Sequence, residues 1–124
     1  MASTPLTAET FGSTVESGIV LVDFWAAWCG PCRAFAPVFE KASEAHPDIV
    51  FGKVDTEAER QLAAAAHITS IPTLMAFRDG VLVFSQPGAL SAPQLEQLIG
   101  AIEQLDMHEV RRNIESTTTT TTRA

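Results

Sequence analysis

Seven consecutive residues, Ile19-Val20-Leu21-Val22-Asp23-Phe24-Trp25, are β-branched, aliphatic or aromatic apart from one aspartate. Because apolar side chains occupy both alternating positions, a strand here has two hydrophobic faces. Such a strand is typical of the centre of a sheet that helices cover on both sides. The chain is therefore expected to form an α/β domain around this segment.

Helix and strand signals alternate along the rest of the chain. Asp79-Gly80 between two apolar runs is a strong hairpin signal. Two pairs of polar residues three apart, Thr56 with Glu59 and Ser91 with Gln94, predict capping boxes at helix starts. The expected order is a short helix near 7–11, strand 19–25, a helix carrying residues 35–42, strand 49–54, a helix to residue 66, strands 72–77 and 81–84, and a last helix from 91 to 105. This order predicts a three-layer α/β/α architecture with a mixed central sheet flanked by helices.

Composition supports one globular domain. The chain has 124 residues, 46% of them hydrophobic, which is enough for one core and leaves no room for a second domain. Its net charge of −7 argues against nucleic-acid or anionic-membrane partners, because both need a basic surface. The N-terminal residues do not resemble a secretory signal, and the apolar run from 18 to 28 is too short to span a bilayer. A monomeric cytoplasmic protein with protein partners is expected.

The composition changes after Asp106. Residues 107–115 are charged and only sparsely apolar, and Thr117–Thr122 is an unbroken threonine run. Such a run buries too little apolar surface to offset the entropy of ordering it. The domain is therefore assigned to residues 1–106, and residues 107–124 are predicted to be a disordered tail. A short helical extension through Arg112, a tether to a partner and a cloning remnant are the alternatives.

Both cysteines, Cys29 and Cys32, follow the apolar strand at the start of the next helix. Two thiols at this spacing can form a disulfide with each other, and the free amides at a helix N-terminus stabilise a thiolate. Between them, Gly30 allows close backbone approach and Pro31 stiffens the turn. We therefore expect dithiol–disulfide chemistry, in which Cys29 attacks a substrate disulfide and Cys32 then attacks Cys29 to release the product.

Other interpretations of the cysteines carry less weight. Two inert buried cysteines would explain the spacing but not the Gly-Pro pair or the preceding Trp28. A zinc site needs about four ligands, and the three histidines, His46, His67 and His108, lie in distant contexts. No metal site is expected, and no histidine is assigned to the active site.

Three segments together resemble the thioredoxin family: Val22-Asp23-Phe24-Trp25-Ala26-Ala27-Trp28-Cys29-Gly30-Pro31-Cys32, Ser70-Ile71-Pro72-Thr73 and Gly88-Ala89-Leu90. The similarity covers about residues 5–105 in order and spacing. It implies the thioredoxin fold and a protein-disulfide reductase without a bound cofactor. Its redox-active Cys29–Cys32 disulfide would be recycled by thioredoxin reductase, a flavoprotein that uses NADPH, and its substrates would be disulfide-containing client proteins.

The resemblance also assigns roles to single residues. It implies that Cys29 is the nucleophile, that Cys32 is the buried resolving thiol, and that Asp23 accepts the proton of Cys32. Burial in an apolar strand is expected to raise the pKa of Asp23.

A client-docking surface around the cysteines follows from the same resemblance. Ile71–Pro72 matches the family's cis-proline, which would bring the Ile71 backbone beside Cys29, where an extended substrate could pair with it. The implied surface consists of Trp28, Gly30, Pro31, Ile71, Pro72 and Gly88. Trp25 is assigned to the core beside the active-site helix.

One position departs from the family pattern. Many thioredoxins have a lysine near the buried aspartate, but the matching position in the second strand is Phe51, and Lys53 falls two residues later on the same face. Without a lysine neighbour, Asp23 would be harder still to ionise. The strand register decides between Phe51 and Lys53.

Two rival functions remain open. A disulfide oxidase or isomerase would use the same cysteines, although Gly30-Pro31 favours the reductant because oxidants and isomerases of the family usually have other residues there. A non-catalytic binding subunit would use the surface around Trp28 without redox turnover.

Overall fold

The computed structural model describes residues 2–123, with side chains described as far as residue 115. Its five-stranded sheet has the order β1-β3-β2-β4-β5. The strands are β1 (Thr4–Pro5), β2 (Ile19–Trp25), β3 (Val50–Asp55), β4 (Thr73–Arg78) and β5 (Val81–Pro87). β2 is central and parallel to β3, which is parallel to β1, whereas β4 is antiparallel to both β2 and β5. The predicted mixed sheet is confirmed.

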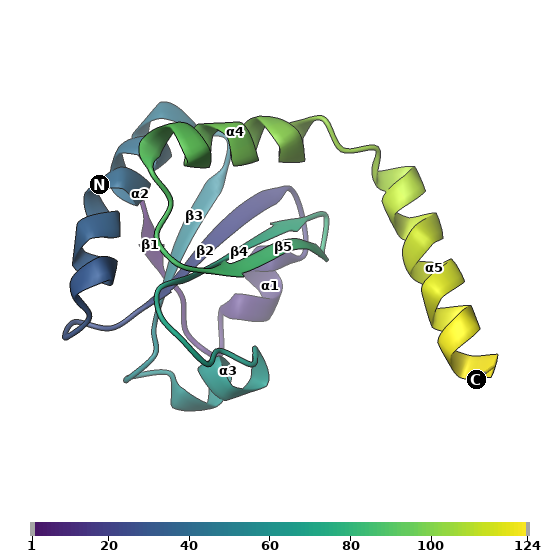
Figure 1. The fold of residues 1–124 in the computed structure, drawn as a ribbon, viewed down its shortest axis with the longest axis horizontal. Helices are drawn as coiled ribbons and strands as arrows, with labels where there is room; N and C mark the ends of the chain where they lie inside the picture. Colours follow the sequence, from purple (N-terminus) through teal and green to yellow (C-terminus); the bar gives the residue numbers. More distant parts are fainter. Residues whose placement is uncertain (1, 124) are drawn as a thin grey trace.

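Helices cover both faces of this sheet (Figure 1). The helices are α1 (Phe11–Val15), α2 (Gly30–Ala45), α3 (Arg60–Ala65), α4 (Ala92–Glu103) and α5 (Met107–Arg123). α2 and α4 lie on one face of the sheet, and α1 and α3 lie on the other. The three-layer α/β/α architecture predicted from the sequence is therefore confirmed.

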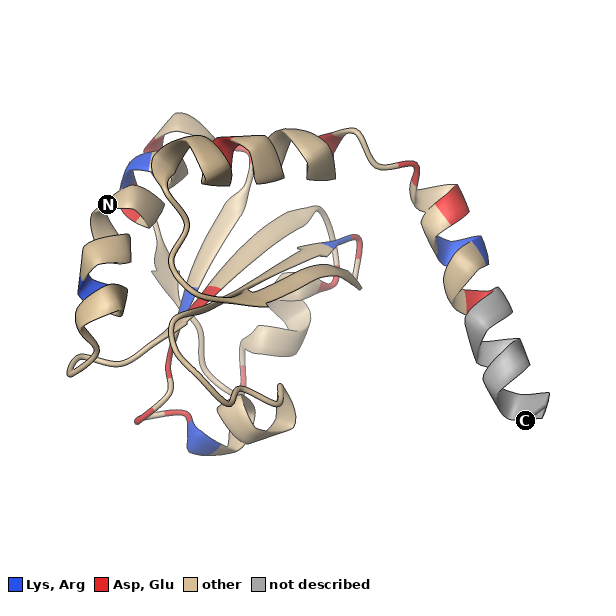
Figure 2. Cartoon of the chain, in the orientation of Figure 1, with Lys and Arg blue, Asp and Glu red and all other residues tan. Residues whose placement is uncertain are grey.

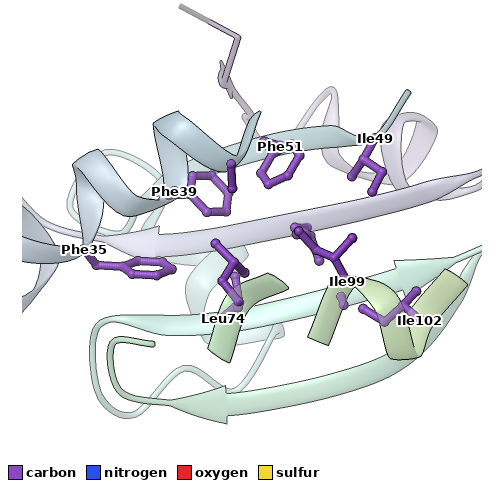
Figure 3. Packing of buried hydrophobic residues seen from close by; sticks show 11 residues of the cluster. Phe35, Phe39, Ile49, Phe51, Leu74, Ile99 and Ile102 are labelled. Carbon is purple, nitrogen blue, oxygen red and sulfur yellow. The ribbon is translucent and has the colours of Figure 1, made fainter. Parts of the chain in front are cut away.

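The core has two halves, one on each side of β2. On the α2/α4 side, Phe39 and Phe51 meet edge to face with their ring centroids 5.2 Å apart, and Ile99 of α4 belongs to the same cluster (Figure 3). On the other side, alternate residues of β2 join side chains from α1 and from the region of α3. Both faces of β2 are buried, as its two-sided apolar pattern predicts.

Local features of the fold differ from the prediction. The two-residue strand β1 pairs with β3 and is too short to give a sequence pattern. The capping box expected at Thr56 is wrong: α3 begins only at Arg60, without a side-chain cap. The Thr56 hydroxyl donates instead to the Trp25 carbonyl at 3.0 Å, and Asp55 Oδ1 accepts from the Glu57 amide at 2.9 Å. The polar groups that could have started a helix therefore hold the loop after β3 against β2.

The last helix, α5, occupies the segment expected to be a disordered tail. Asp106 Oδ1 accepts from the backbone amides of His108 and Glu109 at 3.0 and 3.3 Å, which caps the helix start, and Met107 is buried. These local contacts define the start of α5, which the composition did not reveal. Arg111 of α5 also donates to the Asp79 carbonyl in the β4–β5 turn at 3.4 Å, and the far end of the helix extends away from the three layers (Figure 1). Ala124 and the side chains from Ser116 onward, including those of the threonine run, lie outside the described residues.

Charged residues lie mainly on helices and loops around the sheet (Figure 2). Only a few interrupt the strands, and Asp23 of β2 is among them. No helix in the described part of the chain is both long and apolar enough to cross a membrane.

Candidate active site

The two cysteines form a disulfide at the start of α2. Cys29 is the N-cap residue of this helix, and its Sγ accepts from the backbone amide of Cys32 at 3.2 Å. Pro31 occupies the first turn, where its missing amide donor costs no helical hydrogen bond. Cys29 and Cys32 are 4% and 2% exposed, so only a narrow part of the disulfide reaches the surface. The geometry agrees with the predicted position of the pair at a helix N-terminus.

A second segment lies against the disulfide from the start of β4. The Ile71–Pro72 bond is cis, as the resemblance implied, and the Ile71 carbonyl oxygen lies 3.7 Å from Cys29 Sγ. The amide of Gly88, which has a φ of +103°, donates to the Pro72 carbonyl at 2.8 Å. Residues far apart in the sequence therefore meet beside Cys29, because the antiparallel β4–β5 pair returns the chain to this end of the sheet.

The surface around the disulfide is partly apolar. Trp28 is 67% exposed, Gly30 and Pro31 are exposed beside it, and Ile71 is half-buried. A hollow of about 500 Å³ extends from Trp28 and Ile71 to α3, where Ala63, Ala64 and Arg60 line it. Of the predicted docking residues, only Pro72 is buried, and the others reach the surface at one end of the sheet. The wall contributed by α3 was not predicted, because small alanines on a helix give no binding signal.

Asp23 is completely buried on β2, two residues before the strand ends. Neither carboxylate oxygen has a hydrogen-bonding partner among the described residues. Burial raises the pKa of Asp23 to about 6, against the opposing effect of the positively charged Lys53. An unpartnered, buried carboxyl group that titrates near neutral pH can exchange a proton under physiological conditions.

The register of β2 and β3 settles which residue faces Asp23. Lys53 lies directly opposite Asp23, whereas Phe51 lies opposite Leu21 and belongs to the core. The interpretation that Phe51 occupies the family's lysine position is therefore wrong. The sequence could not decide this, because residues 51 and 53 share a face and only the pairing register separates them.

Trp25 is half-buried and packs against the cysteines, together with Ile71. The assignment of Trp25 to the core missed a second contact: Lys53 Nζ lies 4.8 Å from the centre of its ring. A cation at this distance from an indole face is attracted by the ring's electron density.

Two of the three histidines lie at or just after the ends of helices. His46 Nε2 is 2.8 Å from Glu96 Oε1 at the junction of α2 and α4, and His67 has a φ of 59° after α3. Within the described part of the chain, no three histidine, cysteine or carboxylate residues are grouped so that they could hold a metal ion.

A buried cysteine pair at a helix N-terminus, with a cis-proline beside it and a partly apolar rim, defines a dithiol–disulfide oxidoreductase of the α/β class. The family model described as Thioredoxin matches residues 2–101. The chain belongs to the thioredoxin family, and it acts as a protein-disulfide oxidoreductase by dithiol–disulfide exchange at its Cys-Gly-Pro-Cys site.

Relatives in bacteria and fungi support the same conclusion. A protein named Putative thioredoxin 2 from Streptomyces coelicolor is 58% identical over 110 residues, which cover 88% of this chain and 82% of the relative. A thioredoxin from Staphylococcus aureus is 47% identical over 83 residues, which cover 64% of this chain and 78% of the relative. The crystal structure of a thioredoxin from Malassezia sympodialis superposes with a TM-score of 0.73 at 31% identity, covering 82% of this chain and 93% of that chain.

Proposed function

We propose that this chain reduces the disulfides of client proteins in the cytoplasm, with Cys29 as the attacking thiol and Cys32 as the resolving thiol. The assignment rests on the Cys32 amide, which points at Cys29 Sγ from 3.2 Å. In the reduced protein, the same donor and the positive end of the α2 dipole stabilise a thiolate at Cys29. Cys32 lies one turn further into the helix, which suits attack on Cys29 rather than on a client.

The exchange takes place in two steps that transfer two electrons to the client. The Cys29 thiolate attacks one sulfur of the client disulfide, which forms a mixed disulfide and releases the other client sulfur as a thiolate. Cys32 then loses its proton and attacks Cys29 Sγ, so that the mixed disulfide breaks, the second client thiolate leaves and the Cys29–Cys32 disulfide forms. Asp23 accepts the proton of Cys32, a role supported by its burial and by its pKa of about 6.

The client binds over the exposed rim of the disulfide. Its apolar residues contact Trp28 and the exposed turn of Gly30 and Pro31, and its extended backbone pairs beside Ile71, near Pro72 and Gly88. The support for this surface is the exposure of Trp28 and the proximity of the Ile71 carbonyl to Cys29. A thioredoxin reductase containing flavin and using NADPH then returns the pair to the dithiol form.

The proposed unit of function is a monomeric domain over residues 1–106, with residues 107–124 outside it. The family match, which ends at residue 101, supports this boundary. In this assignment α5 takes no part in disulfide exchange, and the chain serves as an electron carrier that maintains cellular thiols.

Trapping the mixed disulfide tests the order of the two thiols. Cys32→Ser should accumulate a covalent complex with a disulfide-containing client protein, because the resolving thiol is missing. The matched control, Cys29→Ser, should form much less of it, since Cys32 lies one turn further into the helix and lacks the amide contact that stabilises a thiolate at Cys29. Non-reducing electrophoresis followed by mass spectrometry of the linked peptides measures both. A complex that forms mainly through Cys32 would reverse the assignment.

Two further measurements separate the rival functions. A reduction potential of the Cys29–Cys32 pair in the strongly reducing range supports the reductase, and a distinctly oxidising value favours an oxidase or isomerase. A variant with both cysteines replaced by serine should lose all function toward clients; retained function would indicate a binding subunit.

A further inference from the structure

Trp25, Asp23 and Lys53 face the same side of the sheet at the carboxyl end of β2. Asp23 and Trp25 are two residues apart on β2, and the register pairs Asp23 with Lys53 and Trp25 with Asp55 on β3. Residues two apart on a strand share a face. Lys53 therefore lies on the same face of the sheet as both Asp23 and Trp25, within reach of both.

The structure places the Lys53 ammonium group over the indole ring. Its Nζ is 4.8 Å from the ring centre, while neither oxygen of Asp23 has a hydrogen-bonding partner among the described residues. Lys53 therefore acts on Asp23 through space, not through a direct hydrogen bond. A lysine has a long flexible side chain that normally extends into water, so a contact that holds its charged end against the protein changes the field at a nearby carboxyl group.

We propose that Trp25 is a positioning residue: its indole face keeps the Lys53 ammonium group beside Asp23 instead of allowing it to extend into solvent. The inference rests on the proposed role of Asp23 as proton acceptor. It gives Trp25 a function in addition to packing, because the same ring also contacts the cysteine cluster.

The neighbourhood of Asp23 makes Lys53 the charge whose position matters. On β4 the residue opposite Asp23 is the uncharged Leu74. On β3 the next side chain on the same face is Asp55, whose Oδ1 accepts from the Glu57 and Ala58 amides at 2.9 and 3.3 Å. From α2, Cys29 and Cys32 approach the cluster that Trp25 joins, and in the disulfide form neither can ionise. Burial and Lys53 are the two causes that set the pKa of Asp23.

A double-mutant cycle tests the proposal in the oxidised protein. The four proteins are wild type, Trp25→Leu, Lys53→Met and the double variant, and the readout is the titration of the Asp23 carboxyl carbon by NMR. In the presence of Lys53, losing the ring should lower the acid dissociation constant of Asp23 by up to about fivefold, the strength expected of one cation–π contact. In the Lys53→Met background, Trp25→Leu should not lower it further. Trp25→Phe, which keeps an aromatic face, should fall between wild type and Trp25→Leu.

The proposal would be overturned if Trp25→Leu changed the acid dissociation constant of Asp23 equally with Lys53 present and with Lys53→Met. The ring would then act on Asp23 only by excluding water. If Trp25→Leu does not fold, the same cycle with Trp25→Phe applies the same criterion. The experiment needs no client and no turnover, so a result that contradicts the role of Trp25 leaves the proposed function untouched. Failure of the proposed function would instead appear as an Asp23→Asn variant that resolves mixed disulfides with the pH profile of wild type.

Discussion

Two charged side chains on neighbouring strands are largely buried, but within the described part of the chain only one of them has hydrogen-bonding partners. Arg78, at the end of β4, is three-quarters buried and donates through Nη1 to the carbonyls of Ile102, Glu103 and Leu105 at 2.7, 3.2 and 2.9 Å. Asp23, on the central strand β2, is fully buried and its carboxyl oxygens have no hydrogen-bonding partner among the described residues. The guanidinium group of Arg78 is therefore hydrogen-bonded to backbone carbonyls, whereas the carboxyl group of Asp23 has no hydrogen-bonding partner among the described residues.

Under the proposed function, the difference separates a charge that stabilises the fold from one that takes part in the chemistry. The last carbonyls of a helix lack intrahelical donors, so a guanidinium group at the end of α4 satisfies them and joins this helix to the sheet. A buried carboxylate without a partner opposes folding whenever it is ionised. Ionised Asp23 therefore makes the protein less stable, and its proposed role as proton acceptor would give a reason for its presence.

The largest effect is expected from Asp23→Asn, which removes the ionisable group and keeps its shape. Because the pKa of Asp23 is raised from 3.8 to about 6, ionisation of wild type costs up to about 3 kcal/mol of folding free energy at neutral pH. The variant should be more stable than wild type by an amount approaching this value at pH 7. Urea unfolding of the oxidised proteins as a function of pH measures the difference.

The sign follows from proton binding. From about pH 4 to about pH 6 the folded wild type keeps the Asp23 proton while the unfolded chain has lost it, so raising the pH favours unfolding. The advantage of Asp23→Asn should therefore grow across this window and be absent below it. A variant that is less stable than wild type at pH 7 would show that Asp23 is satisfied in solution and would remove the contrast with Arg78.

The next effect, in the opposite direction, is expected from Arg78→Met. This change removes the donor to three carbonyls but keeps the apolar part of the side chain, so the variant should lose about 2 kcal/mol of unfolding free energy. Its reduction potential should equal that of wild type, because Arg78 lies at the opposite end of the strand from Thr73 and the cis-proline. Arg78→Lys, which keeps the charge but loses the planar fork, is the matched control and should recover part of the loss. A shifted potential would show that the two ends of the sheet are coupled.

These two residues also show how far the sequence predicts the molecule. Local patterns predict the strand that contains Asp23 and the position of the cysteine pair. They also predict the hairpin at Asp79-Gly80, which β4 and β5 form. Local patterns do not predict the neighbours of Asp23 and Arg78. The pairing of Lys53 with Asp23 depends on the register of two strands, and the carbonyls that accept from Arg78 are 24 or more residues away in the sequence. Backbone acceptors leave no mark in the sequence, so the structural role of Arg78 could not be predicted. The start of α5 depends on a similar local detail, the cap at Asp106.

The smallest effect is expected at the other end of α4, where the sequence did predict the contacts. Ser91 Oγ accepts from the Gln94 amide at 3.3 Å and Gln94 Oε1 accepts from the Ser91 amide at 2.9 Å, which forms the predicted capping box. Both residues are exposed, so water can replace part of what Ser91→Ala removes, and the loss should be about 1 kcal/mol. Chemical unfolding measures it, with Gln94→Ala as the matched control for the reciprocal bond. If Ser91→Ala costs more than Arg78→Met, the exposed N-terminal cap holds α4 in place more strongly than the partly buried arginine, and Arg78 is not the main link between this helix and the sheet.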